Sequence, residues 1–158
     1  MTNTVIGVGG MAVGRVGDTL VTYALGSCLG LTLYDPETRV GGLLHALLPQ
    51  SKINPEKARD NPAMFVNTGV PSLFLAVYEL GGVKERLVVK AAGCGAPLGA
   101  GTMFNTGDRN YTVLKKILWK NNVLLDAEDV GGSKARTVTL DLTTGKVTIS
   151  SGGERREL

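Results

Sequence analysis

Cys28 and His45 are the two side chains of this sequence that together could perform nucleophilic catalysis. Cys28 stands in the segment ALGSCLG, residues 24–30, where small neighbours leave room for another molecule's backbone beside the sulfur. His45, the single histidine, follows 17 residues later. A free thiol is only a few per cent thiolate at neutral pH. A neighbouring imidazole can take the thiol proton and later give it to a departing amine, which predicts amide hydrolysis at Cys28.

Two apolar runs, residues 28–34 and 40–48, predict the strands that would bring this pair together. Between them lie Asp35 and Pro36, which favour the first positions of a type I turn, so we expect an antiparallel hairpin. If the turn centres near Glu37, position 28 lies opposite a position close to 45. Opposed side chains point to one face, with backbones about 5–7 Å apart, which is the reach that a thiol and an imidazole need.

Thr22, Ser27 and Gly26 complete the predicted site. A catalytic imidazole needs a third group that fixes its tautomer. Thr22 lies six residues before Cys28 on the preceding predicted strand, residues 20–25, and its hydroxyl can accept a hydrogen bond from a ring N–H. Backbone N–H groups at Gly26 and Ser27 are the candidates for contacting substrate and holding the oxyanion of a tetrahedral intermediate.

A purely structural interpretation of the same residues stays open at this point. A cysteine in an apolar strand is most often a small buried hydrophobe. A histidine in the run LLHALL, residues 43–48, is typical of a satisfied core residue. Cys94 has the same structural interpretation, and no second histidine is present to activate it.

Strands dominate the rest of the pattern, and helices come in pieces between them. We expect a single domain over residues 1–158, with sheets packed together, helices outside, and a frayed tail at about 151–158. The segment Gly107–Asn110 predicts the start of a helix, with Asp108 near its N-terminus. The expected elements are a hairpin of residues 4–8 and 11–16, a polar loop at 50–60, a helix at 61–80 with Asn61 as N-cap, a strand at 86–92, an irregular stretch at 93–101, a helix at 108–121, a strand at 123–127, and a hairpin of 136–142 and 146–150.

Composition and charge narrow the class of function. The net charge of +3 comes from scattered basic residues and only 5% of residues are aromatic, so the sequence predicts no nucleic-acid partner. No signal peptide and no apolar stretch near 20 residues are apparent, which predicts a cytoplasmic protein without membrane insertion. Two cysteines and one histidine fall short of four zinc ligands. We therefore expect no metal, no cofactor and reduced thiols.

Several of these segments resemble the CheD family of chemoreceptor glutamine deamidases. The resemblance rests on the block TYALGSC at residues 22–28, on Asp35-Pro36, and on the run HALLP at 45–49. It extends over nearly the whole chain, through residues 5–9, GDRN at 107–110, AEDVGG at 127–132, Ala135-Arg136 and the turn at 144–146.

The resemblance implies a three-layer α/β sandwich and a concrete reaction. Members of this family convert glutamine side chains on the cytoplasmic helices of chemotaxis receptors to glutamate, with release of ammonia. The family's catalytic cysteine, histidine and threonine fall on Cys28, His45 and Thr22. A CheC-type phosphatase is the implied further partner, and no cofactor is implied.

One departure from the family pattern and two other functions stay open. Where the family has a stretch like GGAxMF, residues 92–104 are longer and contain Cys94, which bears on partner preference if that segment contacts partners. The fold can also serve as a binding module for a CheC-type phosphatase with little hydrolysis. A different cysteine hydrolase, such as a receptor methylesterase, would use the same residue types.

Overall fold

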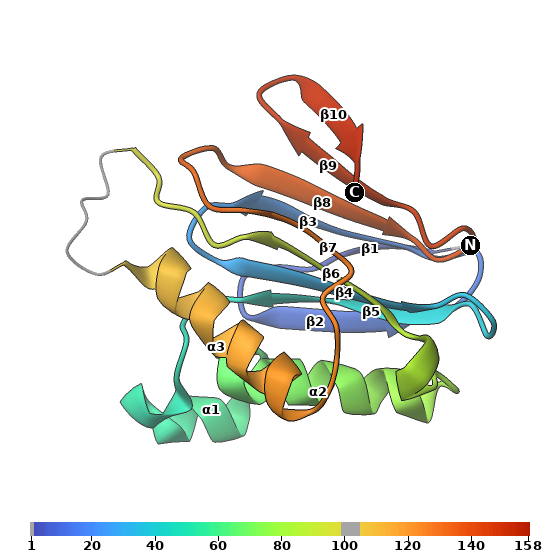
Figure 1. Ribbon diagram of the computed structural model, residues 1–158, viewed down its shortest axis with the longest axis horizontal. Helices are drawn as coiled ribbons and strands as arrows, with labels where there is room; N and C mark the ends of the chain where they lie inside the picture. Colours follow the sequence, from blue (N-terminus) through green and yellow to red (C-terminus); the bar gives the residue numbers. More distant parts are fainter. Residues whose placement is uncertain (1, 99–104) are drawn as a thin grey trace.

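The computed structural model describes residues 2–98 and 105–158. Two five-stranded sheets are stacked, and helices cover the free face of one of them (Figure 1). The outer sheet has the order β1 (Asn3–Val5), β3 (Thr19–Leu25), β8 (Arg136–Asp141), β9 (Val147–Ser151), β10 (Glu154–Glu157). The central sheet has the order β2 (Gly10–Gly14), β5 (Val40–Ala46), β4 (Leu29–Asp35), β6 (Val88–Gly93), β7 (Ala127–Val130).

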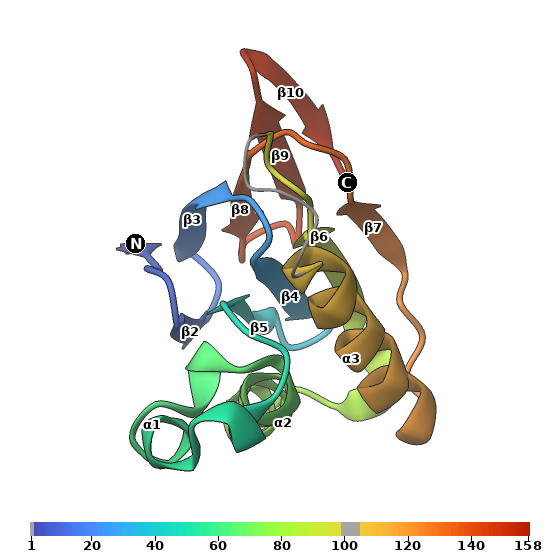
Figure 2. The same ribbon diagram turned by 90° about the vertical axis from the view of Figure 1, so that its left-hand side faces the viewer.

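The helices lie on the side of the central sheet that faces away from the outer sheet (Figure 2). Two of them, α2 (Val66–Glu79) and α3 (Thr106–Lys120), pack on that sheet. The shorter helical segments are α1 (Pro55–Asp60) and the 3₁₀ turns η1 (Ser51–Ile53), η2 (Pro62–Met64) and η3 (Lys84–Arg86). The layers are therefore sheet, sheet and helices, which confirms the expected α/β sandwich.

Burial follows from the central position of the second sheet. Every residue of β4 and β5 is buried, since these strands are covered on both faces. Leu31 and Leu44 pack against α2 and α3 in one core, whereas Leu43 packs against Leu20 of the outer sheet in a second core. A strand covered on both faces is apolar at nearly every position, which explains the continuous runs in the sequence.

The hairpin expected from residues 4–8 and 11–16 is wrong. β1 pairs in parallel with β3 of the outer sheet, whereas β2 pairs antiparallel with β5 of the central sheet. Gly9, with a φ of +73°, turns the chain from one sheet to the other. The local pattern marks two short strands and a glycine turn, but long-range pairing decides their partners.

Two expectations for residues 50–80 also need correction. The segment 50–60 contains η1 and α1, and the Asn54 side chain caps α1 by accepting from the Lys57 N–H at 3.1 Å. The helix expected over 61–80 starts late, because Phe65 has an extended backbone that separates η2 from α2. Pro62 therefore opens a short 3₁₀ turn, and α2 begins at Val66.

The C-terminal third of the chain differs in two places from the elements expected from the sequence. The strand expected at 123–127 begins only at Ala127 and pairs in parallel with β6. The tail expected to be frayed forms β10, antiparallel to β9, and the Leu158 N–H donates to Val147 O at 2.8 Å. All four residues of β10 are exposed, so no apolar pattern marks this strand. The described residues form ten strands in all.

The strand ends gather the predicted site residues at one end of the sandwich. The pairings place the C-terminal ends of β5 and β6 beside the N-terminal end of β4, and the C-terminal end of β3 packs over it through Leu25. This is the left-hand end in Figure 1 and the end facing the viewer in Figure 2. Residues 22–28, 45–48 and 93–97 therefore meet there, although they are far apart in the sequence.

Asp35, the last residue of β4, anchors the opposite end of the sandwich. Its carboxylate accepts hydrogen bonds from the N–H groups of Glu37, Thr38 and Val83 and from the guanidinium of Arg86, at 2.8–3.3 Å. Burial by itself raises the pKa of Asp35, but the Arg86 hydrogen bonds and the three N–H donors outweigh it and hold the pKa well below its usual range.

Asp35→Asn is expected to lower the free energy of unfolding at pH 7 by about 2–3 kcal/mol, because Arg86 and the backbone donors lose a charged acceptor. A folded-state pKa below the unfolded value stabilises the fold above about pH 4, and this contribution is lost as the pH falls through the folded-state pKa. Urea unfolding at pH 7 and at about pH 3 should show the wild-type advantage shrinking in acid. Glu37→Gln is the control, since Glu37 pairs with Arg86 at an exposed position and should change stability little. Equal stabilities of wild type and Asp35→Asn at pH 7 would contradict this account.

Candidate active site

Thr22 and His45 meet between the two sheets. Thr22 of β3 is fully buried, His45 of β5 is 1% exposed, and Thr22 Oγ1 lies 2.7 Å from His45 Nδ1. The same hydroxyl donates to Ile6 O at 2.6 Å. Since a hydroxyl has one proton, Thr22 Oγ1 accepts its second hydrogen bond from Nδ1–H. The neutral imidazole then has its lone pair on Nε2, which is the state of a general base.

Glycines stand beside His45 on both neighbouring strands. Gly10 of β2 and Gly30 of β4 are its directly paired residues. A Cβ on Gly30 would lie 2.6 Å from Leu25 Cδ1, so the lack of a side chain lets β3 pack closely over β4 at this point. The ring therefore has no side chain from either paired neighbour beside it, and Nε2 has no hydrogen-bond partner among the described residues.

Cys28 immediately precedes β4 and lies on the same face of the central sheet as His45. Gly30, and not Cys28, is directly opposite His45, so the expected antiparallel pairing is confirmed with a register that differs by two residues. Side chains two residues apart on a strand share a face, and Cys28 packs in the core between the sheets together with Leu43. Thr22, His45 and Cys28 are all buried, and Cys28, at 8%, is the most exposed of the three. Within the described part of the chain no hydrogen bond joins Cys28 Sγ to His45 Nε2.

Burial sets the protonation states of both groups. It raises the pKa of the Cys28 thiol, and the Cys28 N–H beside the sulfur offsets this in part. Burial also lowers the pKa of His45. Both directions favour the neutral forms, so at neutral pH the free protein holds a thiol and a neutral imidazole, ready for transfer of one proton.

The backbone at Gly26 and Ser27 is fixed through its carbonyl groups. Gly26 O accepts from the Gly95 N–H at 2.8 Å, and Ser27 O accepts from Asn110 Nδ2 at 2.9 Å. The N–H groups of Gly26, Ser27 and Cys28 donate to no backbone carbonyl among the described residues. Both predicted oxyanion positions thus lie beside Cys28 with N–H groups that are available.

Asn110 is a site residue that the sequence analysis missed. Its segment, GDRN at 107–110, reads as a helix start, and α3 does begin there, at Thr106. Asn110 is nonetheless fully buried, and its side chain reaches the loop of Cys28 and the residue Leu47 that follows β5. An asparagine at an inward helical position is the signal that could have marked it.

The backbones of Cys94 and Cys28 are hydrogen-bonded to each other, but the two side chains lie on opposite sides of the central sheet. The Cys94 N–H donates to Cys28 O at 2.8 Å, whereas the Cys94 side chain packs in the core beneath α2 and α3. Burial raises the pKa of Cys94 to about 12. The thiol therefore behaves as a buried apolar group, and the longer segment that contains it, residues 92–104, lies partly outside the described residues at 99–104.

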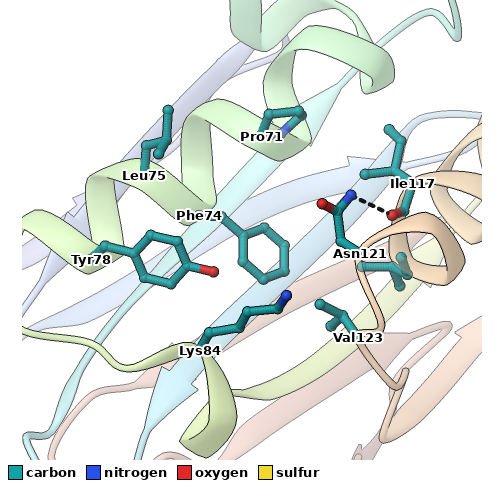
Figure 3. Close-up of a pocket in the computed structure, with 9 residues that line it drawn as sticks. Pro71, Phe74, Leu75, Tyr78, Lys84, Ile117, Asn121 and Val123 are labelled. Carbon is teal, nitrogen blue, oxygen red and sulfur yellow. Dashed lines mark hydrogen bonds between the residues drawn. The ribbon is translucent and has the colours of Figure 1, made fainter.

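A groove lies elsewhere, between α2 and α3 (Figure 3). This groove of about 350 Å³ is lined mainly by apolar side chains, among them Phe74, Tyr78 and Ile117, with Lys84 at its edge. It contains none of Thr22, Cys28 and His45, which lie on the other side of the central sheet.

The described residues hold neither a cluster of metal-binding side chains nor a helix suited to crossing a membrane. No three His, Cys, Asp or Glu side chains come together there as ligands of a metal ion. No helix in residues 2–98 and 105–158 has the length and hydropathy that crossing a membrane requires.

Comparisons with known proteins place this geometry in context. The family described as CheD chemotactic sensory transduction matches residues 47–151. A protein of Syntrophus aciditrophicus named probable chemoreceptor glutamine deamidase CheD 1 is 50% identical over 145 residues, 91% of each chain. A probable chemoreceptor glutamine deamidase CheD of Solibacter usitatus is 43% identical over 100% of this chain and 94% of its own. One from Pyrococcus horikoshii is 44% identical over 90% of this chain and 88% of its own.

Proposed function

The chain belongs to the CheD family, and from this membership we propose that it hydrolyses glutamine side chains of chemotaxis receptors to glutamate, with Cys28 as the nucleophile. The observation that carries the assignment of residues is the 2.7 Å contact between Thr22 Oγ1 and His45 Nδ1. It leaves the lone pair of Nε2 on the face of the sheet that His45 shares with Cys28.

The first half of the reaction forms a thioester. Nε2 of His45 takes the Cys28 proton as the sulfur attacks the carboxamide carbon, and the carbonyl oxygen becomes an oxyanion. N–H groups of Ser27 and Cys28, with Gly26 alongside, hold that oxyanion. When the tetrahedral intermediate collapses, the C–N bond breaks and the imidazolium gives its proton to the nitrogen, which leaves as ammonia.

The second half releases glutamate. Water attacks the thioester carbon while Nε2 of His45 takes one of its protons. The C–S bond breaks, the sulfur recovers that proton, and the side chain leaves as a carboxyl group. Throughout the cycle Thr22 keeps the proton on Nδ1, so the same ring nitrogen works as base and acid in both halves.

The small exposed fraction of Cys28 favours a slender substrate group. Since 8% of the residue is exposed, we expect the substrate to approach it with an extended side chain that ends in a planar carboxamide. Glutamine has that shape, with two methylene groups between its backbone and the amide.

The reaction class is tested with receptor cytoplasmic fragments as substrates. Incubation with the wild-type protein should release ammonia and raise the mass of particular glutamine-containing peptides by about one mass unit. Matched peptides that carry glutamyl methyl ester at the same position separate a deamidase from a methylesterase. Methanol release without ammonia release would refute the proposal.

The site of action and a second partner are proposed on the same basis. A substrate on receptor cytoplasmic helices supports a cytoplasmic location. A CheC-type phosphatase is the further partner that family membership supports. If binding of that partner were the main role, ammonia release from receptor fragments would be absent while the complex still formed.

The two perturbed pKa values predict different pH profiles for deamidation and for alkylation of Cys28. Deamidation needs the neutral pair, so kcat/KM should already be at its plateau near pH 7, because the lowered pKa of His45 moves the acid limb to lower pH. Alkylation by iodoacetamide needs the thiolate, so its rate should still rise above about pH 9, because the pKa of Cys28 is raised. Peptide mapping assigns the alkylated cysteine. An alkylation rate that levels off between about pH 5 and 7 would instead indicate a preformed thiolate–imidazolium pair.

A further inference from the structure

Asn110 joins α3 to both segments that carry the site. One hydrogen bond of its side-chain amide runs to Ser27 O at 2.9 Å, and the other runs to Leu47 O at 3.2 Å. Ser27 precedes the nucleophile, and Leu47 follows the base by two residues. The residue is fully buried, so these contacts are shielded from competing water.

The start of α3 is seated firmly enough to make this contact rigid. Gly107 packs directly on the backbone of Cys94 and Gly95, and a Cβ there would overlap those atoms. The Gly95 N–H in turn holds Gly26 O, and the Cys94 N–H holds Cys28 O. The loop from 26 to 28 is therefore held on one side by the two residues that follow β6 and on the other side by α3.

Holding Ser27 O also orients the N–H of Cys28. The two groups belong to one planar peptide unit, in which C=O and N–H point in opposite directions. With Ser27 O directed at Asn110, the Cys28 N–H is directed away from α3, on the side of its own sulfur. The partial offset of the Cys28 pKa by this N–H agrees with that placement.

We propose that Asn110 is a positioning residue for deamidation, whose amide fixes the Ser27–Cys28 peptide so that the Cys28 N–H faces the developing oxyanion. The inference rests on the proposed function and deepens it by naming how one oxyanion donor is preorganised. An amide suits the position because it supplies two N–H donors for two carbonyl acceptors, whereas a carboxylate supplies none.

The test compares two reactions of the same thiol in Asn110→Ala. Deamidation of receptor fragments passes through an oxyanion, so kcat should fall about 100-fold with KM nearly unchanged. Alkylation of Cys28 by iodoacetamide forms no oxyanion, so its rate should change by no more than about threefold. Asn121→Ala is the matched control, because Asn121 caps the C-terminal end of the same helix and its exposed side chain donates only to Ile117 O.

Asn110→Asp keeps the shape of the side chain if Asn110→Ala does not fold. It lacks both donors when ionised and regains one when protonated, so the ratio of its deamidation rate to the wild-type rate should rise as the pH falls. Unchanged deamidation in the folded variants, or deamidation and alkylation that fall together, would overturn the positioning role. A wild type that releases no more ammonia than Cys28→Ala overturns the proposed function itself, and this inference with it.

Discussion

Cys28→Ala is expected to reduce deamidation of receptor fragments by about 10⁴-fold or more, down to background. The reaction depends on a covalent thioester, and alanine offers no atom that can form it. The substitution removes a single sulfur atom from the core, which is a small change in buried volume, so the fold should persist. Ammonia release and peptide mass, measured at matched protein concentration, give the loss directly.

Two companion variants make the result specific to the nucleophile. Cys28→Ser keeps the shape but offers a hydroxyl that is far harder to deprotonate than a thiol, so it should also lose most activity. Cys94→Ala should retain activity within a few-fold, because the Cys94 side chain lies on the helix side of the central sheet. Deamidation by Cys28→Ala at near wild-type rate would refute the mechanism, and equal losses in both cysteine variants would point to general destabilisation.

The proximity of Cys28 and His45 was predictable because their relation is local in the sequence. The strands β4 and β5 are adjacent and joined by one short turn, and the turn residues after Asp35 favour an antiparallel hairpin. A period of two then puts both side chains on one face. The exact register of the two strands could not be predicted, because it depends on the geometry of the turn. In the structure it differs by two residues from the expected register, and Gly30 lies opposite His45.

Contacts between the layers of the fold could not be predicted from the sequence. Thr22 could be proposed for its chemistry, but the stacking that brings Thr22 Oγ1 to His45 joins two sheets with no shared strand. Asn110 meets Ser27 across 83 residues of sequence. The strands β1 and β2 look like a hairpin until their partners are known. The exposed strand β10 follows from pairing with β9 alone, because its residues ERRE have no apolar face.

The fold class was easier to predict from the sequence than these contacts. Continuous apolar runs at β4 and β5 indicate strands covered on both faces, and the apolar face of α3 indicates a helix laid on a sheet. Together they require three layers, because a sheet buried on both sides needs one layer on each. The family resemblance supplied the same architecture independently of these patterns.

His45→Asn separates the two nitrogens of the base and should reduce deamidation by about 10³-fold or more. The asparagine amide can occupy the place of Nδ1 and donate to Thr22 Oγ1, so the contact between the sheets survives. It has no counterpart to Nε2, so nothing takes the Cys28 proton or delivers one to ammonia. Activity of this variant within about tenfold of wild type would show that another group is the base.

Thr22→Val tests the assignment of the His45 tautomer by changing the other partner of the hydrogen bond between Thr22 and His45. It keeps the base and the packing but removes the acceptor for Nδ1–H, so the proton can shift to Nε2 and the reactive lone pair is lost for part of the time. We expect kcat to fall about 10- to 100-fold, which is less than the effect of His45→Asn, while Thr22→Ser keeps the hydroxyl and most of the activity. The ring-nitrogen resonances of His45 in an NMR spectrum should report Nδ1–H in wild type and a mixture in Thr22→Val. Since Thr22 Oγ1 has one proton and gives it to Ile6 O, Nε2–H in the wild-type protein would contradict the geometry from which both roles are derived.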